Sequence, residues 1–125
     1  MSRGRILLVD DDPRVLQVVS RYLDLEGYEV DTAVDGETAV ASAVAAPPDL
    51  VILDIMMPGI DGIEACRRIR ANGPTAKTPV LMFSALSEET DAARDAGADG
   101  LIAKPFTLPD LAEAVRSFVS QTETS

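Results

Sequence analysis

Four of the five short apolar runs in this sequence end next to side chains that bind metals, act as nucleophiles or carry positive charge. Asp10-Asp11-Asp12 follows the first run and Asp54 the third, while Ser84 follows the fourth and Lys104 the fifth. If the runs are strands of one parallel sheet, these side chains meet beyond the carboxyl ends of the strands, where open α/β sheets place their functional sites. The sequence therefore predicts one site that contains acids, a hydroxyl and an ammonium group.

These groups suit the transfer of a phosphoryl group. Neighbouring carboxylates repel one another, and a hard divalent cation such as Mg²⁺ relieves this repulsion in an all-oxygen site. An Asp carboxylate can attack phosphorus and form an aspartyl phosphate. Mg²⁺, the Lys104 ammonium and the Ser84 hydroxyl would then offset negative charge on the transferred group. Asp12 is interpreted instead as a helix cap, because Pro13 follows it as the first helical residue would.

The elements that must position these groups form five βα units. The expected strands cover residues 5–9, 28–33, 50–53, 79–83 and 100–103. The first, third and fourth are almost continuously apolar, which is typical of strands buried on both faces, whereas the second alternates as an edge strand does. We expect a doubly wound, flavodoxin-like α/β fold, with a five-stranded parallel sheet in the order 2-1-3-4-5.

Amphipathic stretches between the strands predict the helices. They are expected over residues 13–27, 35–45, 62–72, 87–96 and 108–119. The fourth has only alanines as apolar residues, with Ser87 as its expected cap and Gly97 at its end. Such a helix is either the loosest element of the fold, which we expect, or packed tightly through an alanine face, and the sequence leaves both open. Cys66 is spaced with Ile63 and Ile69 to face inward and is interpreted as a core residue.

Composition indicates a single soluble domain. The chain has 125 residues, of which 46% are hydrophobic, and a net charge of −10. This charge repels phosphate backbones and anionic lipid, so we expect no direct nucleic-acid binding and no membrane association. No apolar run is long enough to span a membrane, and there is no signal peptide. The lone Cys66 cannot form an internal disulfide. These three features favour a cytoplasmic protein. Histidine is absent, which excludes Ser–His–Asp and Cys–His nucleophile pairs.

Four motifs occur in order along nearly the whole chain. They are RILLVDDDP, DLVILDIMMPGIDG, PVLMFSA and GADGLIAKPF. Together they resemble the receiver domain of two-component response regulators. The resemblance covers residues 1–120, and residues 121–125 are expected to be a disordered polar tail or the start of a linker. Residues 1–125 could be a free-standing regulator or the N-terminal part of a longer protein.

The resemblance implies roles for the acids at the site. Asp54 would be the phosphorylated residue. Mg²⁺ would be ligated by Asp11, Asp54 and the main-chain carbonyl of Met56, with Asp10 acting through water. The phosphoryl donor would be a histidine kinase or a phosphotransfer protein, and the domain would catalyse its own phosphorylation from phosphohistidine or small phosphodonors without being a turnover enzyme.

The resemblance also implies how the signal is read. Ser84 stands at the position of the family's switch hydroxyl and Lys104 at its invariant lysine, with a cis bond to Pro105. The family often has an aromatic residue where this chain has Leu101, so we expect Leu101 to stay in place and residues 85–97 to respond. The fourth helix, fifth strand and last helix would then form the surface for a downstream effector or a second copy of the chain.

Two apolar residues bear on the lifetime of the aspartyl phosphate. Met56 lies two residues after Asp54, and Leu86 lies two residues after Ser84. Neither side chain can orient a hydrolytic water molecule. We therefore expect slow self-dephosphorylation.

Three other functions fit part of the pattern. A haloacid-dehalogenase-like phosphatase also uses an Asp after a strand, but Pro13-Arg14 replaces the residues expected next and 125 residues leave no room for a cap. A flavodoxin-like FMN protein shares the topology, but Asp10-Asp11-Asp12 would repel the FMN phosphate. A pseudo-receiver, which binds partners without phosphorylation, usually lacks an acid or the lysine, and this chain has all of them.

Overall fold

A computed structural model describes residues 3–84 and 90–119 of the chain. Its five strands form one parallel sheet in the order β2-β1-β3-β4-β5, which confirms the predicted topology. The strands are β1 Arg5–Val9, β2 Glu29–Ala33, β3 Leu50–Asp54, β4 Val80–Ser84 and β5 Gly100–Ala103. Each begins and ends within one residue of its predicted bounds.

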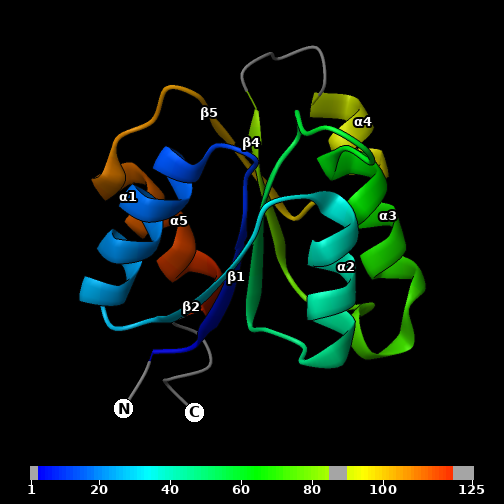
Figure 1. Ribbon diagram of the computed structural model, residues 1–125, viewed down its shortest axis with the longest axis horizontal. Helices are drawn as coiled ribbons and strands as arrows, with labels where there is room; N and C mark the ends of the chain where they lie inside the picture. Colours follow the sequence, from blue (N-terminus) through cyan, green and yellow to red (C-terminus); the bar gives the residue numbers. More distant parts are fainter. Residues whose placement is uncertain (1–2, 85–89, 120–125) are drawn as a thin grey trace.

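Helices cover both faces of the sheet (Figure 1). They are α1 Pro13–Leu25, α2 Gly36–Ala45, α3 Gly62–Ala71, α4 Thr90–Asp95 and α5 Leu108–Val119, with a short 3₁₀ helix, η1, at Gly73–Thr75 that was not predicted. α1 and α5 lie on one face, and α2, α3 and α4 lie on the other. Within residues 3–84 and 90–119, no helix is long and apolar enough to cross a membrane.

The core has two layers because the inner strands are buried on both faces. Alternate residues of β1 face opposite sides, so that Ile6 and Leu8 pack under α1 and α5 while Leu7 and Val9 pack under α2 and α3. β2 is an edge strand and is largely exposed, as its alternating sequence predicted. The sheet is therefore a rigid base for the residues at its carboxyl edge.

The buried face of α4 is small and made of alanine, which fits both interpretations of its sequence. Ala93 is fully buried and the following Ala96 nearly so, whereas Ala92 is exposed. The chain after α4 is held by α3, because the guanidinium of Arg70 donates hydrogen bonds to the carbonyl of Gly97. Gly97 has a φ of +108°, which favours glycine, as predicted for the end of this helix. The predicted cap Ser87, together with Leu86 and the tail at 121–125, lies outside the described residues.

Cys66 packs in the core between α3 and the end of α4, as predicted. It is fully buried, and its thiol donates a hydrogen bond to the carbonyl of Ala96 over 3.4 Å. Burial raises the pKa of the Cys66 thiol, so the side chain is neutral at physiological pH.

Aspartates begin three of the helices. Asp12, Asp35 and Asp61 are the N-cap residues of α1, α2 and α3, and each accepts a hydrogen bond from a main-chain N–H two or three residues later. This confirms that Asp12 is a cap, and it leaves Asp10 and Asp11 as the acids of that segment that face the site. The caps fix where each helix begins relative to the strand before it.

Gly62, the first residue of α3, lies directly against the end of β3. Its N–H donates to the carbonyl of Ile55 over 2.9 Å. A Cβ at this position would clash with the main-chain oxygen of Asp54 and lie 2.9 Å from the Cα of Ile55. Only glycine allows α3 to approach this closely, and the approach fixes the main chain of Asp54.

We expect replacement of Asp35 by Ala to destabilise the domain in a pH-dependent way. The hydrogen bond from the Thr38 N–H lowers the pKa of Asp35 below its usual value. A carboxyl whose folded-state pKa is lowered contributes stability above its unfolded pKa, about 3.9, and loses it as the pH falls through the folded value. Urea unfolding should therefore show Asp35→Ala to be less stable than wild type at pH 7, with a smaller difference near pH 3. Asp35→Asn, which keeps an acceptor but cannot titrate, is the control, and an equal wild-type-to-Ala difference at both pH values would contradict the interpretation.

We expect Gly62→Ala to be destabilising by about 1–3 kcal/mol, because the added methyl group must displace either α3 or the end of β3. Gly73→Ala is the matched control, since a Cβ at Gly73 meets nothing within 4 Å. The control should change the free energy of unfolding by less than about 1 kcal/mol. Denaturant titration of both variants measures this, and two equal effects would show that the close approach of α3 is unimportant.

Candidate functional site

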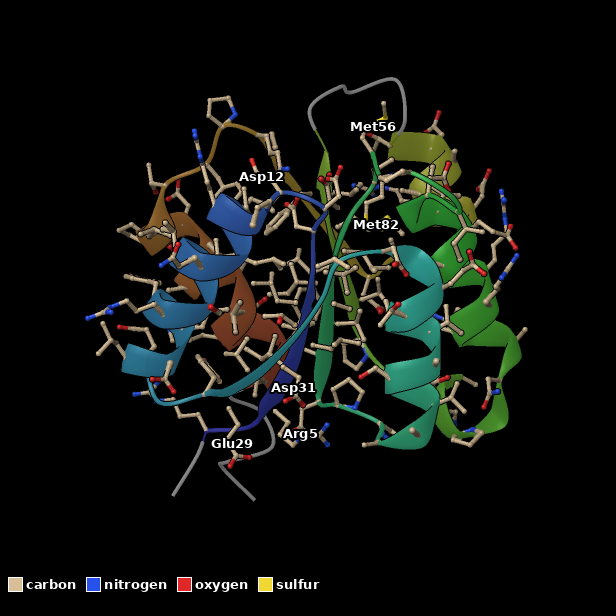
Figure 2. The ribbon with its side chains drawn as sticks, in the orientation of Figure 1. Arg5, Asp12, Glu29, Asp31, Met56 and Met82 are labelled. Atoms are coloured by element: carbon tan, nitrogen blue, oxygen red, sulfur yellow. The ribbon has the colours of Figure 1, made fainter. Side chains whose placement is uncertain are left out.

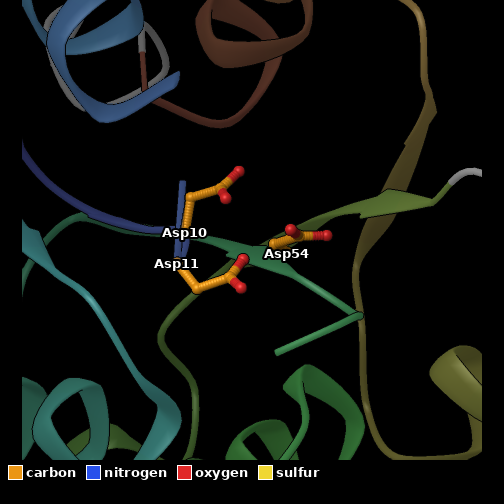
Figure 3. A group of neighbouring side chains, drawn as sticks. All are labelled: Asp10, Asp11 and Asp54. Atoms are coloured by element: carbon orange, nitrogen blue, oxygen red, sulfur yellow. The ribbon is translucent and has the colours of Figure 1, made fainter. Parts of the chain in front are cut away.

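Side chains from three strands converge at the carboxyl edge of the sheet. Asp10 and Asp11 follow β1, Asp54 ends β3 and Lys104 follows β5. Figure 3 shows the three aspartates projecting from the adjacent ends of β1 and β3. Each offers a carboxylate oxygen, and these oxygens all lie within 4.8 Å of one another. The structure thus brings together the acids that the sequence placed at separate strand ends.

Asp10 is the most enclosed of these acids and is fully buried. Burial raises its pKa, and the charge of Asp54 adds to the effect, whereas the Asp12 N–H and Lys104 act in the opposite direction. The Asp12 N–H donates to Oδ1 of Asp10 over 2.9 Å. One oxygen of Asp10 is therefore held by the main chain, and the other faces Lys104.

Lys104 bridges two of the carboxylates. Its Nζ lies 3.3 Å from Oδ2 of Asp10 and 3.2 Å from Oδ2 of Asp54. Partial burial lowers the pKa of Lys104, but the charges and hydrogen bonds of Asp54 and Asp10 outweigh this, and the pKa is raised. The side chain is therefore a cation at neutral pH and offsets part of the negative charge of the site. The Lys104–Pro105 bond is cis, as the resemblance implied.

Asp54 is held by two contacts and is slightly exposed to solvent. Oδ2 faces Lys104, and Oδ1 accepts a hydrogen bond from the Met56 N–H over 3.3 Å. The side chain of Asp54 is 9% exposed, so only a small part of it meets solvent, at the outer edge of the site that we call the rim. Met56 stands at that rim with 61% of its surface exposed (Figure 2). The carboxylate of Asp54 is therefore fixed in position at the end of β3 and retains a small exposed fraction.

Three other residues predicted for the site, Ser84, Leu101 and Met56, are not shown in their predicted roles. The main chain of Ser84 ends β4 and pairs with Ala103, but its side chain lies outside the described part of the structure. Leu101 pairs with Met82 and packs, half-buried, against the core layer under α2, α3 and α4. The ligand role of the Met56 carbonyl remains a prediction. The structure thus assembles Asp10, Asp11, Asp54 and Lys104 and leaves the switch positions untested.

Sequence reasoning missed an aromatic pair beside the lysine. The rings of Phe83 and Phe106 are stacked, with centroids 4.7 Å apart and planes inclined by 24°. Nζ of Lys104 lies over the Phe83 ring, 5.4 Å from its centroid. The available signal was one Phe immediately before Ser84 and another two residues after Lys104.

The donor set determines which metal suits the site. Asp10, Asp11 and Asp54 offer only oxygen atoms, which hard cations such as Mg²⁺ prefer over softer metals. Asp11 is exposed, so the cluster can be reached from solvent. The residues present therefore fit a hydrated divalent cation held mainly by carboxylates.

The sequence matches the family described as response regulator receiver domain over residues 6–116. Among curated proteins, the DNA-binding dual master transcriptional regulator RpaA of Synechocystis is 42% identical over 121 residues, which cover 95% of this chain and 50% of that protein. The chain spans about half the length of the curated relatives it matches.

Solved structures agree with the sequence match. The chemotaxis response regulator CheY4 of Vibrio cholerae aligns with a TM-score of 0.88 and 34% identity, over 92% of this chain and 98% of that one. The receiver domain of a sensor histidine kinase from Pseudomonas aeruginosa, determined with a magnesium ion coordinated in its active site cleft, aligns with a TM-score of 0.87 and 31% identity, over 94% and 98% of the two chains. The strand order is the predicted one, the acidic cluster is joined by a lysine, and the family match covers most of the sequence. This chain therefore belongs to the response regulator receiver domains.

Proposed function

We propose that this domain is a phosphoacceptor switch of two-component signalling in which Asp54 receives the phosphoryl group. The observation that carries the proposal is the position of Asp54, which lies beside the acids that follow β1, contacts the ammonium of Lys104 and keeps a small exposed fraction. Each of Asp10 and Asp54 has one oxygen held by a main-chain N–H, but Asp10 is fully buried whereas Asp54 keeps a small exposed fraction. Of the two acids that contact Lys104, Asp54 is therefore the more accessible to a phosphodonor.

The chemical step is a displacement at phosphorus. A carboxylate oxygen of Asp54 forms a bond to phosphorus while the bond to the donor breaks, and the donor keeps the electron pair of that bond. The donor is the phosphohistidine of a histidine kinase or of a phosphotransfer protein, or a small compound such as acetyl phosphate. The ammonium of Lys104 contacts the Asp54 carboxylate before transfer and can donate hydrogen bonds to the oxygens of the phosphoryl group after it. The domain thereby assists its own phosphorylation, although it does not turn over a substrate.

The metal belongs to the same proposal. Asp11, Asp54 and the Met56 carbonyl would hold Mg²⁺, with Asp10 contributing through water, and the donor set described above supports this assignment. When bound, Mg²⁺ supplies positive charge that reduces repulsion between the acids and the incoming phosphoryl group. Asp10 and Asp11 then act as ligand and orienting groups, while Asp54 alone reacts.

We also propose that the signal leaves through α4, β5 and α5. The Ser84 hydroxyl would move toward the phosphoryl group and draw the chain that leads into α4, which has only a small buried face. A shallow groove of about 430 Å³ on this side is lined by Leu101, Ile102 and Ala114, among others. An effector or a second copy of the chain would bind there, and a DNA-binding output, which the name of RpaA states for that relative, would lie outside this domain.

Phosphorylation of Asp54 can be tested directly. With Mg²⁺ and acetyl phosphate, intact-mass measurement should show one phosphoryl group on the wild type and none on Asp54→Asn, because an amide is not a nucleophile for phosphorus. Asp24→Asn, at an exposed position of α1, is the control and should be phosphorylated as fully as the wild type. Undiminished phosphorylation of Asp54→Asn would overturn the assignment.

The same assay tests the metal. Omitting Mg²⁺ should suppress phosphorylation, and Asp11→Asn should raise the Mg²⁺ concentration needed for half-maximal rate by about tenfold or more, because one of the carboxylate ligands is lost. Calorimetric titration of Mg²⁺ into both proteins provides a measure that does not depend on the phosphodonor. Equal Mg²⁺ affinities would remove Asp11 from the ligand set.

The lifetime of the phosphorylated form should depend on Met56. Its apolar side chain stands at the rim, next to the phosphorylated acid, and offers no hydrogen bond to a hydrolytic water. Met56→Asn should therefore lose its phosphoryl group faster than wild type in the same Mg²⁺ buffer. Leu25→Asn replaces an exposed apolar residue at the far end of α1 and should decay at the wild-type rate. If all three proteins decay alike, the rim position does not control hydrolysis.

A further inference from the structure

The stacked pair Phe83 and Phe106 lies where the side chain of Lys104 must pass. β4 separates β5, which precedes Lys104, from β3, which carries Asp54. Neighbouring strands are about 4.8 Å apart, so the ammonium has to cross the end of β4 to reach the acids. Phe83 is near that end of β4, one residue before Ser84, and its ring is the surface over which Nζ lies.

The two rings hold each other in place. Phe83 is fully buried and pairs with Asp54 in the β3–β4 register, while its carbonyl accepts a hydrogen bond from the Ile55 N–H over 3.3 Å. Phe106 is half-buried and lies two residues after Lys104, so it belongs to the same loop as the lysine. The stack therefore joins the loop that carries Lys104 to the strand that lies beside Asp54.

Lys104 needs such a support because its other neighbours change during the proposed reaction. The ammonium is held at Asp10 and Asp54, and Asp54 is the residue that would become phosphorylated. A lysine side chain has several rotatable bonds and loses much conformational freedom when it is fixed in one position. The face of an aromatic ring attracts a cation, yet it does not use the N–H donors that a phosphoryl oxygen needs. A ring can thus orient Lys104 before and after transfer.

We propose that Phe83 and Phe106 are positioning residues that form an aromatic platform for Lys104 and keep its ammonium directed at the group on Asp54. The proposal rests on the proposed function, since it concerns the approach of Lys104 to the phosphorylated acid. Phe83 contacts the ammonium, and Phe106 acts through Phe83 and the loop that it shares with Lys104.

Kinetics with matched variants tests the platform. Phe106→Leu and Phe83→Leu each remove a ring, and each should lower the rate of Asp54 phosphorylation by acetyl phosphate at saturating Mg²⁺ by about threefold to tenfold. Phe106→Tyr keeps the ring and should restore the wild-type rate. Phe118→Leu is the control, because Phe118 packs against the same core layer beside Gly100 rather than against Lys104. Wild-type rates in both Leu variants, or an equal loss in Phe118→Leu, would overturn the proposal.

A spectroscopic measurement on the unphosphorylated protein separates this idea from the proposed function. The ring current of Phe83 should shift the ε-methylene NMR signal of Lys104 upfield. Phe83→Leu should abolish this shift, whereas Phe118→Leu should preserve it. A Lys104 signal unchanged by Phe83→Leu would overturn the platform even if phosphorylation proceeds. If the wild type accepts no phosphoryl group, the proposed function fails, and this signal alone decides the platform. If Phe83→Leu does not fold, the two Phe106 variants decide. Phe106→Leu should change the Lys104 signal, because Phe83 loses its stacking partner, and Phe106→Tyr should leave the signal as in the wild type. A Lys104 signal unchanged in Phe106→Leu would then overturn the platform.

Discussion

The site depends on one electrostatic constraint, which is that an ammonium group must lie between two buried carboxylates. Asp10 is fully enclosed and Asp54 nearly so, and the burial of two carboxylates side by side requires a nearby cation to offset their charge. Lys104 supplies that cation at 3.3 and 3.2 Å. Burial raises the pKa of Asp10, whereas the charges and hydrogen bonds of Asp54 and Asp10 raise the pKa of Lys104 against the effect of its own partial burial. The pocket is therefore organised around a shared charge before any ligand enters it.

The sheet makes this contact possible. β1 and β3 are neighbours, which puts Asp10 and Asp54 side by side, whereas β5 lies two strands from β3. A short cationic side chain after β5 could not reach the acids, but the long stem of lysine can. Gly62 contributes from the other side, because the absence of a side chain lets α3 lie against the end of β3 and fix the main chain of Asp54.

The fold could be predicted where hydrophobic pattern and capping act locally. The apolar runs gave the strands within one residue, and Asp12 was identified as a cap because Pro13 follows it. Convergence of the acids with Lys104 was also predictable, since parallel strands end at one edge. The Phe83–Phe106 stack was not predictable, because it depends on how the loop after Lys104 folds back. Phe83 could be predicted only as a residue of a buried strand, and Phe106 belongs to no periodic pattern. The short helix η1 was also missed, because its three residues are too few to form a periodic pattern.

The two ends of the described chain meet at the edge of the sheet opposite the acids. A Cβ on Gly4 would lie 2.6 Å from Cγ1 of Val119, so the residue before β1 is in contact with the last residue of α5. Figure 2 shows Arg5, Glu29 and Asp31 near this edge, while Asp12 and Met56 lie near the other. A strand of five residues is about 17 Å long. Any segment covalently joined to either end would thus begin about one strand length from the acids. A chemical event at Asp54 could influence such a segment only by displacing the structure that lies between them or by causing separate molecules to assemble.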